Sequence, residues 1–263
     1  MDIDEGRPNP ARPNPARPDP RTDPSSRQLI PLCVPYEARK VPGPAGGVWD
    51  PVQKQWFVTR ERLAENFEAF RPFTPRMYRP DRQAPFIRPF MIPSSSWGKN
   101  LRAVLKRPEW DVVRKAAYRR SGYCCVVCGG RGPTHPVEAD EAWSYDMGTG
   151  TQTLATVASL CPDCHSIRHW GKTQLDGREE EITRHLAFVN GTSPHETARL
   201  IDDGISTWHR RNAMKWTVDY SWVTRKYGFV PSSEGFVRAR QENQKFRDMA
   251  REAAETVFRV NRM

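Results

Sequence analysis

Short apolar runs near the start of the chain have the length of β-strands. Residues 29–36 form one apolar run, and residues 48–58 form two more that are separated by Asp50-Pro51. An amphipathic helix is expected over residues 63–70. Together they predict a small α+β module over residues 28–73. Its expected core includes three aromatic side chains, those of Trp49, Trp56 and Phe57.

The middle of the chain changes from helical to strand periodicity and back. A helix is predicted from near Lys99 to Gly122, because Pro108 suits a helix start and Trp110, Val113 and Ala117 share a face. A strand over 138–145, a turn over 146–150 and a return strand from Thr151 predict a hairpin. On this strand, Glu138 and Asp140 should share one face while Glu141 points the other way. A helix carrying Cys164, His165 and His169 is then expected from Pro162. The predicted fold class is therefore α+β.

The rest of the chain predicts supporting elements and two segments of unusual composition. Helices are expected over 179–189 and from the capping box Ser193-Pro194-His195-Glu196, and alternation over 216–222 predicts a strand. Residues 231–263 carry a long helical pattern whose apolar side suggests a protein partner. The repeated RPNPA of residues 1–27 predicts a disordered Pro/Arg-rich arm.

The charge of the chain is concentrated in residues 71–120. The whole chain has a formal net charge of +10, and this segment alone holds 13 Lys or Arg against Asp81, Glu109 and Asp111. Such a balance favours a polyanionic partner, with double-stranded DNA the leading expectation and a merely solvated surface the alternative. The predicted nucleic-acid contacts are Lys99, Arg102, Lys106, Arg107, Arg114, Lys115, Arg119 and Arg120.

Four of the six cysteines form two Cys-x-x-Cys pairs, Cys125/Cys128 and Cys161/Cys164. This pattern predicts a closed structural Zn²⁺ site with four thiolate ligands. Neither a secretory signal nor an apolar run long enough for a membrane helix is present in the sequence. We therefore expect a cytoplasmic protein with no membrane partner, in a reducing compartment where thiol pairs hold metal.

The segments around these cysteines resemble the HNH endonuclease family, in its four-cysteine, zinc-supported form. The resemblance covers about residues 97–228 and rests on CVVCGG from Cys125, VEADEAWSYD from Val137, QTL from Gln152, LCPDCHSIRHWG from Leu160 and WTVDYSWV from Trp216. Residues 28–73 resemble a small Trp-containing module of unknown function that occurs beside DNA-processing enzymes of mobile genetic elements. That second resemblance rests on Pro35-Tyr36, Trp49-Asp50 and Trp56.

The HNH resemblance implies a ββα-metal core and hydrolysis of phosphodiester bonds with a divalent ion such as Mg²⁺. It places the ion on His165, with Asp140 as second ligand or weak base, and Glu138 and His169 complete the candidate catalytic residues. One residue departs from the family pattern: Asp140 stands where the family has its general-base His. A carboxyl group with a reference pKa of about 3.9 is a poor base at neutral pH. His135 could replace it, whereas His165 and His169 could instead only pack around the zinc site.

The expected organisation is an arm (1–27), a small module (28–73), a basic linker (74–98), an HNH-like zinc domain (99–230) and a C-terminal helix (231–263). Three functional hypotheses stay open at this stage. The first is an HNH-type DNA endonuclease, with catalysis impaired by Asp140. The second is a non-catalytic nucleic-acid-binding or adaptor module on the same scaffold. The third is a zinc-stabilised interaction protein that does not contact nucleic acid.

Overall fold

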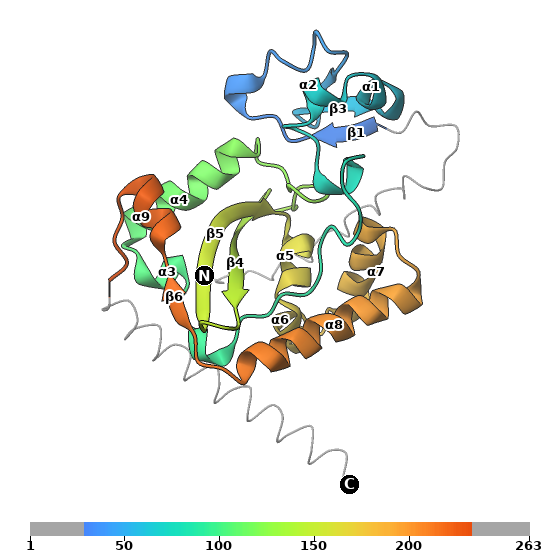
Figure 1. Cartoon of the computed structure of the whole chain (residues 1–263). Coiled ribbons are helices and arrows are strands. Elements are labelled where there is room, and N and C mark those ends of the chain that lie inside the picture. The colour runs from blue at the N-terminus through green and yellow to red at the C-terminus, as the bar shows by residue number, and fades with distance from the viewer. Residues whose placement is uncertain (1–28, 233–263) are drawn as a thin grey trace, which may run out of the picture.

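The computed structural model describes residues 29–232 and shows a mixed α+β protein with two three-stranded sheets in that range (Figure 1). The predicted α+β class is confirmed at this level. The predicted arm over 1–27 lies outside the described residues, as does the long helix expected over 231–263 except for residues 231–232, which are not helical. The smaller sheet belongs to the N-terminal module, and the larger one forms the centre of the second part.

The N-terminal sheet has the order β1-β3-β2, from strands β1 (Leu29–Leu32), β2 (Val48–Asp50) and β3 (Gln55–Thr59), all antiparallel. The helix predicted over 63–70 is wrong in its bounds, because the chain forms two short helices. These are α1 (Arg60–Glu65), which starts at the Thr59 N-cap, and α2 (Phe67–Phe70). The module's buried core consists of Ile30, Leu32, Val58, Leu63, Phe70 and Phe73.

The expected aromatic core of this module is wrong in one place. Trp49 is 46% exposed and packs its ring against Trp56, with the ring centroids 5.6 Å apart. Phe57 and Trp56 are only partly buried. The strand β2 lies at the edge of the sheet, and none of its three residues is buried. Short 3-10 turns over Tyr36–Ala38, Arg76–Tyr78 and Ser94–Ser96 complete the irregular segments.

The larger sheet is built on the predicted hairpin. Strand β4 (Glu138–Asp146) pairs antiparallel with β5 (Thr151–Leu160), and the register runs from Glu138 opposite Leu160 to Asp146 opposite Thr151. In the turn, the Asp146 carboxylate accepts a hydrogen bond from the Gly148 N–H, and Gly150 takes a φ of +66°. A third strand, β6 (Thr217–Asp219), lies parallel to β5. The strand predicted over 216–222 is thus limited to three residues.

Helices cover the two faces of the hairpin (Figure 1). One face packs against α3 (Leu101–Val104), α4 (Arg107–Arg120) and α9 (Ser221–Tyr227). The other contacts α5 (Pro162–Arg168), which is followed by α6 (Trp170–Leu175), α7 (Glu179–Asn190) and α8 (Pro194–Asn212). Each face has its own buried cluster of side chains. The hairpin therefore lies between the side chains of α4 and those of α5.

Local sequence signals explain where these helices begin and end. Ser193 and Glu196 form the predicted capping box at the start of α8, and α7 ends where Gly191 takes a left-handed conformation. The helix expected to carry His169 is wrong at its C-terminal end. It stops at Arg168, and His169 is its C-cap, with a φ of −97° and a ψ of 49°.

The N-terminal module packs directly on the first Cys-x-x-Cys turn. The Arg76 and Met77 N–H groups donate to the Val126 and Val127 carbonyls, and the Gln55 amide donates to the Gly129 carbonyl at 3.0 Å. Residues 86–97, in the segment predicted as a linker, lie against the C-terminal helices. In that segment the Phe86, Phe90 and Ser94 N–H groups donate to Asn190, Arg168 and Asn212 respectively.

Gly122 lies where the N-terminal module packs closely against the rest of the protein. It has a φ of +57°, and a Cβ atom there would lie 2.1 Å from the Val34 carbonyl oxygen. Gly177 has a similar φ of +66° with nothing within 4 Å of its virtual Cβ. We expect Gly177→Ala to cost only the left-handed conformation, about 1 kcal/mol. Gly122→Ala adds the backbone clash and should lower the free energy of unfolding by about 2 kcal/mol more.

Urea unfolding of both variants measures this difference. Equal losses in the two variants would show that the contact between Gly122 and Val34 does not form in solution.

Candidate functional site

The four cysteines of the two Cys-x-x-Cys pairs meet in one buried cluster. Their Sγ atoms all lie within 4.8 Å of one another, and the Cys128 and Cys161 Sγ atoms are 3.6 Å apart. A tetrahedral Zn²⁺ site with Zn–S bonds of about 2.3 Å requires sulfur–sulfur separations of about 3.8 Å. The cluster therefore fits a single metal ion of this kind with little rearrangement.

Local backbone structure brings the four thiols together. Gly129 takes a φ of +73°, which closes the first turn, and the Gly130 N–H donates to the Cys128 Sγ at 3.4 Å. Cys161 is the N-cap of α5, with Pro162 in the first turn of that helix. The second pair therefore spans the junction between strand β5 and helix α5.

Electrostatics in this cluster favour a bound cation. Hydrogen bonds from the thiols of Cys125, Cys128 and Cys164 lower the pKa of Cys161 far below its usual value. Burial, followed by hydrogen bonds to the same neighbours, raises the pKa of Cys164 well above its usual value. The Cys164 thiol is therefore neutral at physiological pH. A metal ion bound here would displace its proton and stabilise the thiolates.

His185 of α7 is a contact that the sequence prediction missed. Its Nε2 lies 3.2 Å from the Cys164 Sγ. The signal was present, because His185 falls between Ile182 and Leu186 on the buried side of α7. A ring nitrogen at this distance can orient a metal-bound sulfur.

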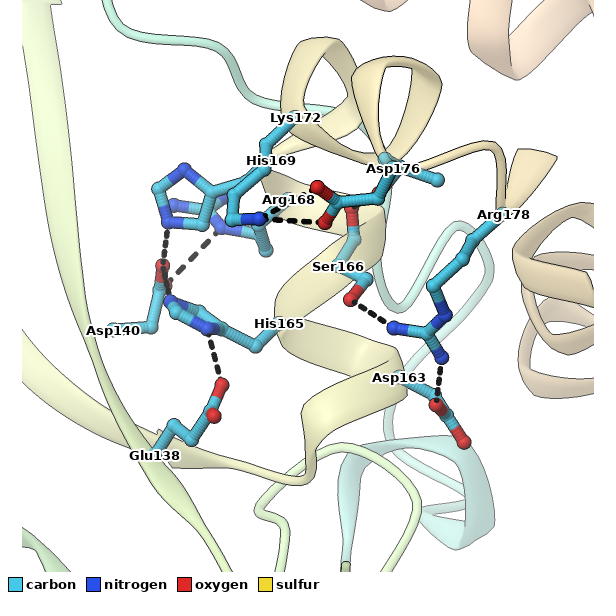
Figure 2. Close-up of polar contacts among 11 residues, drawn as sticks. Glu138, Asp140, Asp163, His165, Ser166, Arg168, His169, Lys172, Asp176 and Arg178 are labelled. Atoms are coloured by element: carbon cyan, nitrogen blue, oxygen red, sulfur yellow. Dashed lines mark hydrogen bonds and ion pairs between the residues drawn. The ribbon is translucent and has the colours of Figure 1, made fainter. Parts of the chain in front are cut away.

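A second cluster lies beside the first, where β4 meets α5. The Asp140, His165 and His169 side chains each place a potential ligand atom within 4.8 Å of the others. Asp140 Oδ1 is 4.0 Å from His165 Nε2 and 3.7 Å from His169 Nε2, and Figure 2 shows the carboxylate facing both imidazole rings. Asp140 is only 5% exposed. One carboxylate and two imidazoles are a suitable ligand set for a divalent ion.

Glu138 contributes to this site as a hydrogen-bond partner of His165. Its Oε2 lies 2.6 Å from the His165 Nδ1, and the carboxylate accepts a hydrogen bond from the N–H of that nitrogen. The hydrogen bond to His165 lowers the pKa of Glu138, so the carboxylate stays ionised. This contact leaves the His165 Nε2 lone pair facing Asp140. Carboxylate–histidine pairs of this kind fix the tautomer of metal-binding histidines.

The protonation state of His169 also suits a residue that could bind a metal ion. Burial lowers its pKa to about 4, with a further contribution from the neighbouring His165 and an opposing one from Asp140. His169 is therefore neutral at physiological pH, and a ring nitrogen keeps its lone pair. Its imidazole stands nearly perpendicular to that of His165, with the ring centroids 4.5 Å apart.

Two arginines and two aromatic rings surround the second cluster, and the sequence prediction included none of them. The Arg168 Nε donates to the Asp140 Oδ2 at 3.2 Å, and its guanidinium stacks over the Phe90 ring at 4.2 Å. Arg211 lies over Phe90 and Tyr145, at 4.5 and 4.2 Å. Arg168 directly precedes His169 and could have been considered. Phe90 and Arg211 reach the site only through the packing of segments distant in sequence.

The expected alternation along β4 is confirmed. Glu138 and Asp140 face α5, whereas Glu141 points to the opposite side and accepts a hydrogen bond from the Leu101 N–H at 2.7 Å. Burial raises the pKa of Glu141 to about 8, so this carboxyl group is protonated at neutral pH. His135 is exposed in the loop before β4 and is not part of the cluster.

The eight predicted nucleic-acid contacts do not line this cluster. Most of them lie on or next to α4, across the hairpin from α5 (Figure 1). Some are engaged locally: Lys99 donates to the Trp216 carbonyl, Arg114 and Lys115 pair with Asp111, and Arg120 donates to the Val157 carbonyl. The others, Arg102, Lys106, Arg107 and Arg119, are exposed to solvent.

Comparisons with known protein families, with characterised proteins and with solved structures give no match to this chain. Within residues 29–232, no helix has the length and apolar character needed to cross a membrane.

Removing one thiol tests the four-cysteine site. We expect Cys164→Ser to lower the zinc content of the purified protein by about one ion per chain, because a closed structural site needs all four ligands. Cys33→Ser is the matched control, since the buried Cys33 thiol donates to the Cys125 carbonyl and lies outside the cluster. Elemental analysis of both variants measures the change. Unchanged zinc in Cys164→Ser would overturn the assignment.

Proposed function

We propose that this protein is a divalent-metal-dependent endonuclease of the HNH type that hydrolyses phosphodiester bonds in nucleic acid, with double-stranded DNA as the expected substrate. The observation that carries the proposal is the convergence of Asp140, His165 and His169 beside a four-cysteine cluster. The supporting arrangement is a hairpin followed by a helix that starts in the second Cys-x-x-Cys pair.

The donor set supports an ion such as Mg²⁺ or Mn²⁺ at the second cluster. Asp140, His165 and His169 would hold it, and the bound ion would stabilise negative charge on the phosphate and on the leaving oxygen. Glu138 keeps the His165 ring in the orientation that presents Nε2. The four-cysteine cluster, with zinc as its proposed ion, would be structural only.

Arg168 gives this site a fixed positive charge. Its Nε contacts Asp140, and the stacking on Phe90 holds the plane of the guanidinium. Arginine N–H groups bind phosphate oxygens in pairs. Arg168 would therefore position a substrate phosphate next to Asp140 and stabilise the charge that develops on it.

The alternative function is a non-catalytic nucleic-acid-binding or adaptor module, and one observation favours it. Asp140 occupies the position of the family's general base, and its carboxylate is paired with Arg168 and faces two imidazoles. These contacts suit a ligand better than a group that accepts a proton from water. Under the endonuclease proposal, by contrast, the bound ion would have to activate the water, because no histidine stands at the position of the general base.

A plasmid-nicking assay distinguishes the two functions. We expect the wild type to nick supercoiled DNA in Mg²⁺ or Mn²⁺, and His165→Ala and His169→Ala each to reduce the rate by at least about 100-fold, because each removes a metal ligand. His195→Ala is the control, since His195 is exposed at the start of α8. An inactive wild type whose Asp140→His variant cuts DNA would establish the alternative.

The role of Glu138 predicts a more selective effect. Glu138→Gln keeps the shape of the side chain but removes the charge that orients His165. We expect the divalent-ion concentration for half-maximal activity to rise about 10-fold to 100-fold, with most of the rate recovered at saturating metal. Titration of activity against Mn²⁺ gives both quantities. A loss of rate that excess metal does not recover would instead indicate that Glu138 takes part in the chemistry.

A further inference from the structure

A cavity of about 330 Å³ lies between the N-terminal module and the hairpin. We call it the junction cavity. Its lining comes from four regions: Cys33 of the module, residues 72–82 at and after the end of the module, the end of α4, and the end of β5 with the adjoining Val126. The side chains that matter for its chemistry are Arg76, Arg79, Arg82, Arg120 and Ser159. The metal cluster of Asp140, His165 and His169 contributes none of them.

The charge of this cavity is strongly positive. Four arginines line it, and no Asp or Glu is among its lining residues. Asp81 pairs with Arg79 at 2.7 Å, and Arg120 donates one N–H group to the Val157 carbonyl. Within residues 29–232, the guanidinium groups of Arg76 and Arg82 have neither an ion pair nor a hydrogen bond.

Like charges so close together are costly without a counter-ion. Partial desolvation, followed by the positive charges of Arg82 and Arg168, lowers the pKa of Arg76 below its usual value. Asp140 and Cys125 partly oppose this effect. A bound anion would remove the repulsion, and Arg76 lies close enough to interact electrostatically with both the cavity and the second cluster.

A buried hydroxyl group provides independent evidence for a ligand. Ser159 lines the cavity, is only 1% exposed, and its Oγ has no hydrogen-bond partner. An unpaired buried polar group costs about 1–3 kcal/mol. A serine hydroxyl can donate to an anionic oxygen. The cavity thus combines unpaired guanidinium groups with an unpaired donor.

We propose that the junction cavity binds a phosphate group of the nucleic-acid strand on which the Asp140–His165–His169 cluster acts. This inference rests on the proposed function for the identity of the strand. The cavity chemistry is that of a phosphate site, because paired N–H donors from arginine match phosphate oxygens, and the volume is at the small end of the range for ligand pockets. Binding here would hold the strand at a position away from the cleaved bond.

The first test uses inorganic phosphate and the full-length protein. Thermal unfolding is followed in phosphate and in chloride at equal ionic strength. We expect phosphate to stabilise the wild type, and to have little effect on Arg76→Gln/Arg82→Gln. Ser159→Ala should unfold at the same or a higher temperature in chloride, because it removes the unpaired hydroxyl, and should gain less from phosphate. Equal stabilisation of the wild type and both variants would overturn the inference.

The second test measures binding of a fluorescent DNA duplex without added divalent ion. The matched control is Arg199→Gln/Arg225→Gln, which removes two exposed arginines from α8 and α9. We expect Arg76→Gln/Arg82→Gln to weaken binding about 10-fold and to reduce the slope of log Kd against log salt by about 2, and the control to change either much less. Equal losses in the two double variants would contradict a specific site.

Two further comparisons identify the source of the phosphate and separate this inference from the cleavage proposal. Duplexes with and without 5′-phosphates should bind equally if the cavity takes a backbone phosphate, whereas a loss on removing the 5′-phosphate would show that it takes a strand end.

The second comparison uses the variant that lacks a proposed metal ligand. His165→Ala should still bind phosphate and DNA. A protein that never cuts DNA but shows these phosphate effects would disprove the proposed function and leave the cavity assignment intact.

Discussion

The meeting of four thiol groups at one point is the constraint on which the rest of the structure depends. Cys125 and Cys128 come from the turn after α4, and Cys161 and Cys164 from the junction of β5 with α5. An ion bound there would hold the end of the hairpin against the start of the helix. Because His165 directly follows Cys164, its distance to Asp140 on the neighbouring strand is set by the same constraint.

This arrangement explains why Asp140 suits metal binding better than base catalysis. A histidine at position 140 would keep a base that is partly unprotonated at neutral pH. A carboxylate there instead lies among His165, His169 and Arg168, and it offers charge to an ion. The arginines of the junction cavity lie near this cluster, since Arg76 interacts electrostatically with both Arg168 and Asp140, so the proposed phosphate site and the proposed metal site are neighbours in the molecule.

Sequence patterns predicted the parts of the fold that depend on local rules. The cysteine spacing, the hairpin turn at Asp146 and the shared face of Glu138 and Asp140 follow from ligand spacing, turn chemistry and strand alternation. Patterns failed where tertiary packing decides. The break at His169, the contact between His185 and Cys164, and the Arg168–Phe90 stack depend on segments distant in sequence. The basic residues of α4 were predicted to contact nucleic acid from their concentrated charge, and the hairpin separates them from the Asp140–His165–His169 cluster.

The most direct test of the account is a crystal structure of the protein soaked in Mn²⁺, with anomalous scattering measured at the manganese and zinc edges. The account predicts a zinc peak among the four cysteines and a separate manganese peak bound by Asp140, His165 and His169. It also predicts Glu138 hydrogen-bonded to His165 in the loaded state. A zinc peak among the cysteines with no manganese between Asp140 and the two histidines at saturating Mn²⁺ would contradict it.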